Sequence, residues 1–356
     1  MIPQPVKRES TLRILIGEIS GNIDLMVLLM YIIASLISPF LSPYFTLWGF
    51  SLLPTILYII FFFYFVYRLK EEISAVISEK HLPVIFVTGE RDVNRKQRVI
   101  QAENAIKRVT GFDKFGMIER HFHIDLSRAV YWKRTPSGEW INYIEDGIEM
   151  IKCLYYEIRG RKVYHLFLGR PSVIALGLGA ILGRAIIESP PVIVYHEDGG
   201  EYRPVLDLSR DPGRIRERIS GKQYKYIKVD LPKNIGDEVV LALEMTRHPL
   251  MTELRNYISE NNITAPVILV KNTYGGDLKD EDWTRPVQEL YNLILDLRDM
   301  GVRRFHLFIG MHEAMAFGLG YALGSYWDIK VYKLVKERST YELVFSLNEL
   351  PELSLE

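Results

Sequence analysis

The chain has 356 residues, of which 48% are hydrophobic, and its 44 basic side chains are balanced by 44 acidic ones. A long DNA or RNA footprint needs a basic stripe that neutralises many phosphates, so this balance argues against a long nucleic acid as partner. A ligand with few phosphates remains open, because a handful of basic side chains and backbone donors can bind it. The single cysteine, Cys153, fits poorly with a disulfide-stapled extracellular domain.

The N-terminal part of the chain contains a long uncharged stretch. No Asp, Glu, Lys or Arg occurs between Leu25 and Tyr67, and one membrane-spanning helix needs about 20 apolar residues. Pro39 and Pro43 supply a turn in the middle of the stretch. We therefore predict a two-helix transmembrane hairpin over residues 23–67, with helices at about 23–38 and 45–67. The hairpin follows an N-terminal segment of residues 1–22.

Basic residues flank this hairpin on both sides and are missing from its connection, so the positive-inside rule places both chain ends in the cytoplasm. Asp24, at the edge of the first helix, is either an interfacial anchor or part of a pathway. A buried helix pair is a weak alternative, because the stretch is not amphipathic. A cleaved signal peptide is shorter than this stretch. One hairpin encloses no path, so a channel would require oligomerisation.

The remainder of the chain contains one unit twice. Residues 164–183 and 305–324 are identical at half of their positions. Further segments match in the same order. They are Trp140 with Trp283, Val194-Tyr195 with Val331-Tyr332, 202–208 with 341–347, 84–87 with 226–229, and 121–125 with 267–271. Solenoid repeats have periods of about 20 to 50 residues, and each half here is the size of an ordinary domain. The pattern indicates a tandem duplication.

Each half alternates short apolar runs with longer helical patterns, such as 94–109 and 239–258. This alternation predicts an α/β fold of two Rossmann-like halves, residues 82–220 and 221–356. The parallel sheet of each half should be covered on both faces. Ligands of such folds bind beyond the carboxyl ends of the strands.

Gly177, Gly179, Gly318 and Gly320 look like a dinucleotide-binding fingerprint. The fingerprint requires glycines in the strand-to-helix turn, where the backbone approaches pyrophosphate. Here they fall inside the predicted helices. We interpret them as small residues that allow these helices to pack closely on the sheet.

Sites for catalysis are hard to find. His165 and His306 are equivalent strand positions, which favours buried core histidines over ligands. The sequence contains neither a phosphate-binding P-loop nor a nucleophile elbow, and no histidine cluster has metal-ligand spacing. We interpret Glu197-Asp198 and the 280–282 acidic run as solvated turns. These observations favour a sensor without cofactor or metal over an enzyme.

The strand, glycine and polar loop before each glycine-rich helix, at 167–172 and 308–313, together with the Tyr-containing closing strands, resemble the SAVED domain. That domain is a fusion of two CARF-like halves, and the resemblance covers about residues 82–350. It implies recognition of a cyclic oligonucleotide, here a cyclic tri- or tetranucleotide.

The addition of a transmembrane hairpin resembles the two-transmembrane SAVED effectors of CBASS antiphage systems. This resemblance implies an inner-membrane protein whose messenger comes from a cognate nucleotidyltransferase. Ligand binding would form a homo-oligomer in the lipid bilayer, cluster the hairpins and disrupt the membrane, giving abortive infection.

In CARF-like halves the ligand lies over the strand ends, which selects loop residues as candidates. Arginine and lysine suit phosphates, and Ser172 and helix-start amides add donors. The candidates are Thr88, Gly89, Arg91, Gly169, Arg170, Pro171, Ser172, Lys233, Asn234, Lys271, Asn272, Gly310, Met311, His312 and Glu313.

Two alternatives remain open. One is a membrane-tethered Rossmann-like enzyme acting on a nucleotide or nucleotide-sugar, for example a ring nuclease. The other is a CRISPR-associated sensor of a cyclic oligoadenylate, which differs only in the source of its messenger.

Overall fold

The computed structural model describes residue 67 and residues 80–85, 92–110, 139–157, 162–169, 171–184, 191–219, 224–275, 278 and 282–352. Apart from Tyr67, the predicted transmembrane hairpin lies outside these residues, as does the predicted strand at 121–125. Within the described residues, no helix is long and apolar enough to cross a membrane. Apart from Lys80, the strands and helices below belong to one compact unit, residues 81–158 and 162–356.

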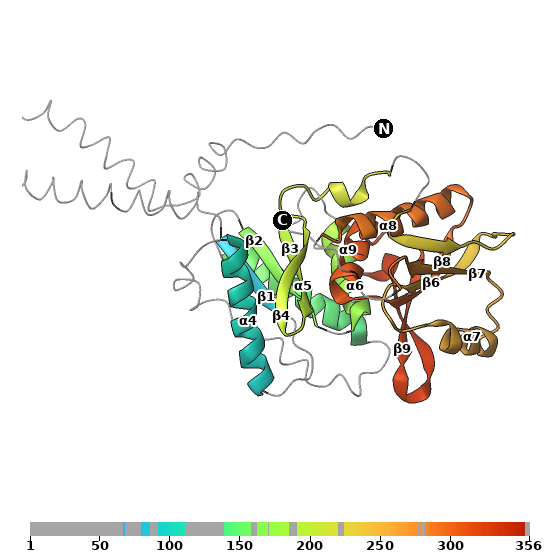
Figure 1. The fold of residues 1–356 in the computed structure, drawn as a ribbon, viewed down its shortest axis with the longest axis horizontal. Coiled ribbons are helices and arrows are strands. Elements are labelled where there is room, and N and C mark those ends of the chain that lie inside the picture. Colours follow the sequence, from blue (N-terminus) through green and yellow to red (C-terminus); the bar gives the residue numbers. More distant parts are fainter. Residues whose placement is uncertain are drawn as a thin grey trace, which may run out of the picture. The chain divides into compact units, whose positions relative to one another are not determined.

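The first half of this unit contains a four-stranded sheet with the order β1-β2-β3-β4 (Figure 1). Strands β2 and β3 are parallel, and β3 and β4 form an antiparallel hairpin. Gly199 and Gly200 make the hairpin turn with φ of 60° and 87°, a conformation that glycine adopts without steric cost. The elements are β1 (Lys80–Ile85), α4 (Asp92–Thr110), α5 (Glu139–Glu157), β2 (Lys162–Phe167), α6 (Ser172–Arg184), β3 (Val192–Asp198) and β4 (Glu201–Asp207).

The second half contains a six-stranded sheet with the order β10-β9-β8-β6-β7-β5. Its four central strands are parallel, and β10 and β5 are antiparallel strands at the two edges. The elements are β5 (Ile227–Asp230), β6 (Glu238–Glu244), α7 (Met251–Glu260), β7 (Val267–Asn272), α8 (Thr284–Asp299), β8 (Arg304–Gly310), α9 (Glu313–Leu323), β9 (Ile329–Val335) and β10 (Thr340–Ser346). Short 3-10 turns are η6 (Arg214–Arg216), η7 (Lys336–Arg338) and η8 (Leu347–Glu349).

The predicted helix at 239–258 is wrong. Residues 238–244 form the central strand β6, and the helix α7 begins only at Met251. A short continuous apolar run fits a fully buried strand as well as a buried helix, and here β7 and β8 pair with both edges of the run. The strand predicted at 226–229 exists as β5, but it is an added edge strand and not the first parallel strand of the half.

Helices cover both faces of each sheet, as predicted. Helix α4 packs on one face of the first sheet through Ala102, Ala105 and Ile106, and α7 packs on the second sheet through Leu254. The largest core cluster combines α5, α6, α8 and α9 with both sheets. The halves also exchange contacts, because α8 touches β4 and α5 touches β10.

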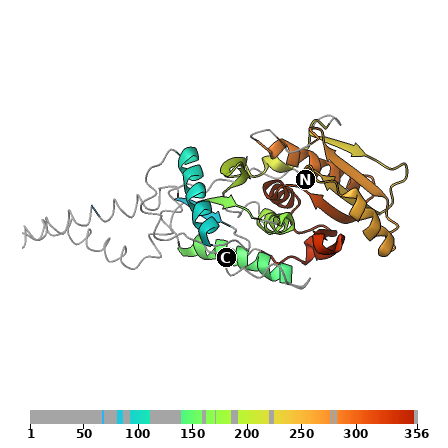
Figure 2. The same ribbon diagram turned by 60° about the horizontal axis from the view of Figure 1, so that its bottom comes forward.

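Helices α6 and α9 lie side by side between the two sheets, and Figure 2 shows them almost end-on. A Cβ added to Gly179 would overlap the carbonyl group of Phe317, and one added to Gly320 would overlap that of Leu176. The prediction that these glycines allow close packing is therefore confirmed. Gly179 and Gly320 lie against the opposite helix, whereas Gly318 lies against Leu206 of the first sheet, as predicted.

The buried histidines form equivalent hydrogen bonds in the two halves, which confirms their assignment to the core. His165 Nδ1 lies 2.8 Å from the hydroxyl of Tyr195, and His306 Nδ1 lies 2.7 Å from that of Tyr332. The other ring nitrogens meet different partners. His165 Nε2 lies 2.9 Å from His81 Nδ1, whereas His306 Nε2 lies 3.0 Å from a carboxylate oxygen of Glu238.

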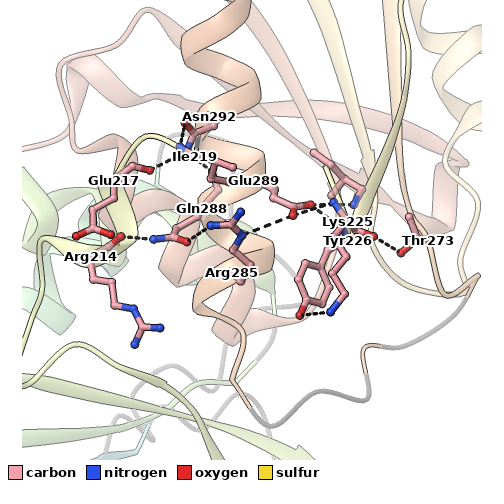
Figure 3. Close-up of polar contacts among 11 residues, drawn as sticks. Arg214, Glu217, Ile219, Lys225, Tyr226, Thr273, Arg285, Gln288, Glu289 and Asn292 are labelled. Atoms are coloured by element: carbon pink, nitrogen blue, oxygen red, sulfur yellow. Dashed lines mark hydrogen bonds and ion pairs between the residues drawn. The ribbon is translucent and has the colours of Figure 1, made fainter. Parts of the chain in front are cut away.

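The segment that connects the two halves is hydrogen-bonded to side chains of α8 (Figure 3). Buried Glu289 accepts backbone N–H bonds from Lys225, Tyr226 and Ile227 at 2.9, 2.7 and 3.2 Å. Asn292 accepts from the Ile219 amide and donates to the Glu217 carbonyl, and Gln288 donates to the Arg214 carbonyl. This set of contacts gives the connecting segment a structural role.

Candidate ligand-binding cleft

A cleft of about 650 Å³ opens where the first sheet meets the start of α9. It lies at the carboxyl ends of β2 and β3, the place predicted for a ligand of a Rossmann-like fold. Its walls come from both halves of the duplication. The lining residues are Arg98, Leu168, Gly169, Tyr195, His196, Glu197, Asp198, Gly199, Arg203, Leu278, His312, Glu313 and Ala314.

The N-terminus of α9 lines this cleft, and α6 begins three residues after the cleft residue Gly169. The Arg216 guanidinium donates to the carbonyls of Gly183 and Tyr321, both at 2.6 Å, so the C-terminal ends of α6 and α9 meet at one side chain. The opposite ends of these helices follow the cleft residues Gly169 and His312. Helix N-termini carry partial positive charge and exposed amides, which favour anions.

Two arginines reach the cleft from the first half. Arg98 of α4 lies 3.4 Å from the Glu197 carboxylate and donates to the Tyr202 hydroxyl at 3.2 Å. Arg203 of β4 lies 3.9 Å from the Asp198 carboxylate and donates to the Leu278 carbonyl at 3.4 Å. The buried Nε of Arg203 has no hydrogen-bond partner within the described part of the chain. An anionic ligand can therefore compete for guanidinium groups that carboxylates now hold loosely.

Two histidines line the cleft in front of a buried tryptophan. The ring centroids of His196 and His312 are 4.4 Å apart. The Trp283 ring lies 4.7 Å from His196 and is stacked on His312 at 5.7 Å. Imidazole rings can stack on a base or donate to a phosphate. The cleft thus combines cations, flat rings and three carboxylates, a set suited to a ligand with phosphates and bases.

The predicted site residues divide into three groups. Gly169, His312 and Glu313 line the cleft. Pro171, Ser172, Gly310 and Met311 lie beside these residues in the chain but are not part of its wall. Thr88, Gly89, Arg91 and Arg170 lie outside the described residues.

The second-half lysines and asparagines do not line the cleft. Lys233 and Asn234 are exposed after β5, and β5 runs antiparallel to β7. The carboxyl end of β5 therefore faces the opposite edge of the sheet, and these two residues lie away from the cleft. Lys271 and Asn272 do lie at the carboxyl edge of β7. There Lys271 pairs with Glu244 at 3.4 Å and Asn272 donates to the Met245 carbonyl at 2.8 Å.

Several lining residues were missed in the sequence. The predicted site drew only on loops after parallel strands, whereas Glu197, Asp198 and Arg203 come from the β3–β4 hairpin and Arg98 comes from a helix. The interpretation of Glu197-Asp198 as solvated turn residues overlooked their contacts with the two arginines. The polar run that ends the apolar strand Val192–Tyr195 was the available signal, because it places charges at a strand end.

Metal binding finds no support in the part of the chain that the structure describes. No group of three or more His, Cys, Asp or Glu side chains there is arranged to hold an ion.

Known structures similar to this chain include Cap4 receptors with SAVED/CARF domains. The Acinetobacter baumannii receptor, solved with the cyclic trinucleotide 3'3'3'-cAAA, is 15% identical with a TM-score of 0.46, covering 60% of this chain and 45% of the receptor. The Moraxella osloensis receptor is 14% identical with a TM-score of 0.41, covering 61% of this chain and 44% of the receptor. At this level the matches establish neither a shared ligand nor a shared assembly.

No curated protein matches the sequence. Residues 214–347, however, match the family model of the SMODS-associated and fused to various effectors sensor domain, known as SAVED. The matched region begins at η6 and includes the whole second sheet, with α8 and α9. The similarity to the SAVED family model therefore covers the second half of the duplication and the segment that leads into it.

Proposed function

We propose that the chain is a sensor whose cleft binds a cyclic oligonucleotide. The observation that carries this proposal is the convergence of the α9 N-terminus, Arg98 and Arg203 on one cleft built by both halves of a SAVED-type duplication. Its volume of about 650 Å³ falls within the roughly 300–1,000 Å³ of small-molecule sites.

Each group in the cleft has a role in this proposal. Arg98 and Arg203 bind phosphates, for which the guanidinium fork is suited. His196 and His312 offer flat rings on which a base can stack. The carboxylates of Asp198 and Glu313 accept hydrogen bonds from amino groups of bases or from ribose hydroxyls, whereas Glu197 holds Arg98 in the ligand-free protein. A ligand with phosphates only would leave those carboxylates opposed to its charge, so a nucleotide fits better than a polyphosphate.

We extend the proposal to the uncharged stretch at residues 23–67. A messenger from a cognate nucleotidyltransferase binds the cleft and favours an assembled state of the protein. Clustered hairpins then disrupt the inner membrane and abort the infection. Ligand can drive this switch only through higher affinity for the assembled state, and moving from 1:99 to 99:1 requires a ~10⁴-fold preference.

The binding step is tested by thermal unfolding of the full chain in detergent with a panel of cyclic di-, tri- and tetranucleotides. Ligand at one hundred times its dissociation constant stabilises the folded state by about 2.7 kcal/mol. We expect a shift for one cyclic species, reduced in Arg203→Ala and unchanged in Arg255→Ala, an exposed charge on α7. If no cyclic nucleotide shifts a folded sample, the sensor proposal fails.

The membrane step is tested separately in liposomes that contain the full chain and an entrapped dye. Addition of the binding nucleotide should release the dye, and a non-binding nucleotide should not. Binding without release would retain the sensor and reject membrane disruption.

An enzymatic alternative rests on the same two histidines. Neighbouring imidazoles beside carboxylates are typical general acid–base groups, so a ring nuclease is the second candidate. We expect a bound cyclic nucleotide to be recovered intact after incubation. Linear products on chromatography, absent in His196→Ala, would favour the enzyme.

A further inference from the structure

Trp283 lies directly behind the cleft and is completely buried. Three cleft-lining side chains contact its ring. His196 lies at a centroid distance of 4.7 Å, His312 is stacked at 5.7 Å, and the Arg203 guanidinium lies over the ring at 6.0 Å. One indole ring thus contacts the basic side chains of the cleft that come from β3, β4 and the start of α9.

The same residue joins the two halves of the unit. It caps the N-terminus of α8 in the second half, and its backbone N–H donates to the carbonyl of Val205 in β4 of the first half at 2.7 Å. Of the side chains it contacts, His196 and Arg203 belong to the first half and His312 belongs to the second. The position of its ring therefore fixes the distance between cleft groups that come from different halves.

The repeat supplies a natural comparison in Trp140, which also opens a helix and is 2% exposed. Equivalent positions around it carry different residues: Lys333 replaces His196, Glu342 replaces Arg203, and Pro171 replaces His312. Lys333 lies over the Trp140 ring at 4.5 Å and pairs with Glu342 at 3.4 Å. None of these residues lines the cleft.

We propose that Trp283 is a positioning residue for the ligand, which holds His196, His312 and Arg203 in the geometry that binds it. This inference rests on the proposed function and adds a specific determinant of affinity. The aromatic face attracts the guanidinium, stacks with the His312 imidazole and contacts the tilted His196 imidazole. Phenylalanine at position 283 would keep a smaller aromatic face, whereas leucine would keep side-chain bulk without an aromatic face. Trp140 has the same size and is also buried. The Lys333 above its ring pairs with Glu342 and not with a cleft residue.

The first test compares Phe and Leu substitutions at both tryptophans in the full chain, with the dissociation constant of the best cyclic nucleotide from the panel as the readout. We expect affinity to fall in the order Trp, Phe, Leu at position 283, with Trp283→Leu weaker by on the order of tenfold. Trp140→Phe and Trp140→Leu should stay within about twofold of wild type, because neither Trp140 nor the Lys333 above its ring lines the cleft. Equal losses at the two positions, or no loss at 283, would overturn the inference.

The second test needs no ligand and therefore separates this inference from the proposed function. The emission of an indole ring depends on the side chains in contact with it. The Trp283 signal, obtained as wild type minus Trp283→Phe, should therefore change in His196→Ala and in His312→Ala at constant pH. The Trp140 signal, obtained with Trp140→Phe, should stay constant in both variants because its neighbour is Lys333. A Trp283 signal that is identical in wild type and both variants would show that its ring does not hold the histidines, whether or not a nucleotide binds.

Discussion

Acid should destabilise this protein through His165, whose side chain is completely buried. Loss of solvation, with a smaller contribution from neighbouring His81, lowers the pKa of His165 from 6.5 to about 3. An unfolded chain binds a proton at this histidine below about pH 6.5, and the folded chain does not until about pH 3. The free energy of unfolding therefore falls as the pH is lowered through this window, and the full contribution is present above pH 6.5.

The size of this effect at pH 5 depends mainly on the unfolded state. The unfolded pKa lies about 1.5 units above pH 5, and one unit corresponds to about 1.4 kcal/mol, so His165 should cost about 2 kcal/mol at pH 5 relative to pH 8. Urea unfolding of the full chain at the two pH values, followed by tryptophan fluorescence, measures the difference.

His165→Gln isolates the contribution, since glutamine can bond to the Tyr195 hydroxyl but does not titrate. We expect the variant to lose about 2 kcal/mol less than wild type between pH 8 and pH 5. His81→Glu provides a second variant, because the other half has a carboxylate, Glu238, against its equivalent histidine. It should recover part of the acid loss by giving protonated His165 an ionic partner. Identical pH dependence in wild type and His165→Gln would mean that the folded protein protonates His165 readily, and the reasoning would be wrong.

Three further predictions concern the helix pair and the cleft. Gly179→Ala should lower the unfolding free energy by about 2 kcal/mol, because its Cβ overlaps the Phe317 carbonyl. In the same urea assay Gly213→Ala should be neutral or slightly stabilising, since its φ of −72° suits alanine and its nearest neighbour is 3.6 Å away. Arg216→Met should cost about 2 kcal/mol or more by leaving the C-terminal carbonyls of α6 and α9 unpaired, and an unchanged urea midpoint would contradict the proposed clamp. Glu197→Gln should tighten nucleotide binding several-fold at low salt by releasing Arg98; weaker binding in a titration would mean that Glu197 itself contacts the ligand.

Most of the fold features that could be predicted from the sequence came from the duplication. Matched apolar runs located β2, β3, β4 and their counterparts, because buried strands of a covered sheet are continuous in hydrophobicity. Equivalent strand positions also identified His165 and His306 as core residues. The helix prediction for residues 239–244 was wrong because a short buried strand and a buried helix segment have the same composition. The order of the strands in a sheet is a tertiary property, which is why β5 was mistaken for a parallel strand.

The candidate site was harder to predict than the fold. Loops after parallel strands provided Gly169, His312 and Glu313, which line the cleft. The two arginines lie far from these loops in sequence and reach the cleft only through the packing of α4 and the β3–β4 hairpin. No local pattern distinguishes Arg98 from other arginines on a helix. Its contact with Glu197 exists only after the helix has packed on the sheet.

Comparison of the two halves separates the residues needed for folding from those available to a ligand. Each half keeps a histidine–tyrosine hydrogen bond and a stacked Phe–Tyr pair, Phe167 with Tyr195 and Phe308 with Tyr332, both at 4.4 Å. These contacts are internal to each sheet and do not distinguish one half from the other. The surroundings of Trp283 and Trp140 do differ. His196, His312 and Arg203 contact Trp283 and line the cleft, whereas Lys333 and Glu342 lie near Trp140. A ligand in the cleft meets cations from the first half and a helix N-terminus from the second, so one chain presents an asymmetric surface to it. Such a surface gives a cyclic ligand of mixed bases or linkages one preferred orientation. Two identical sets of binding groups would allow two equivalent orientations.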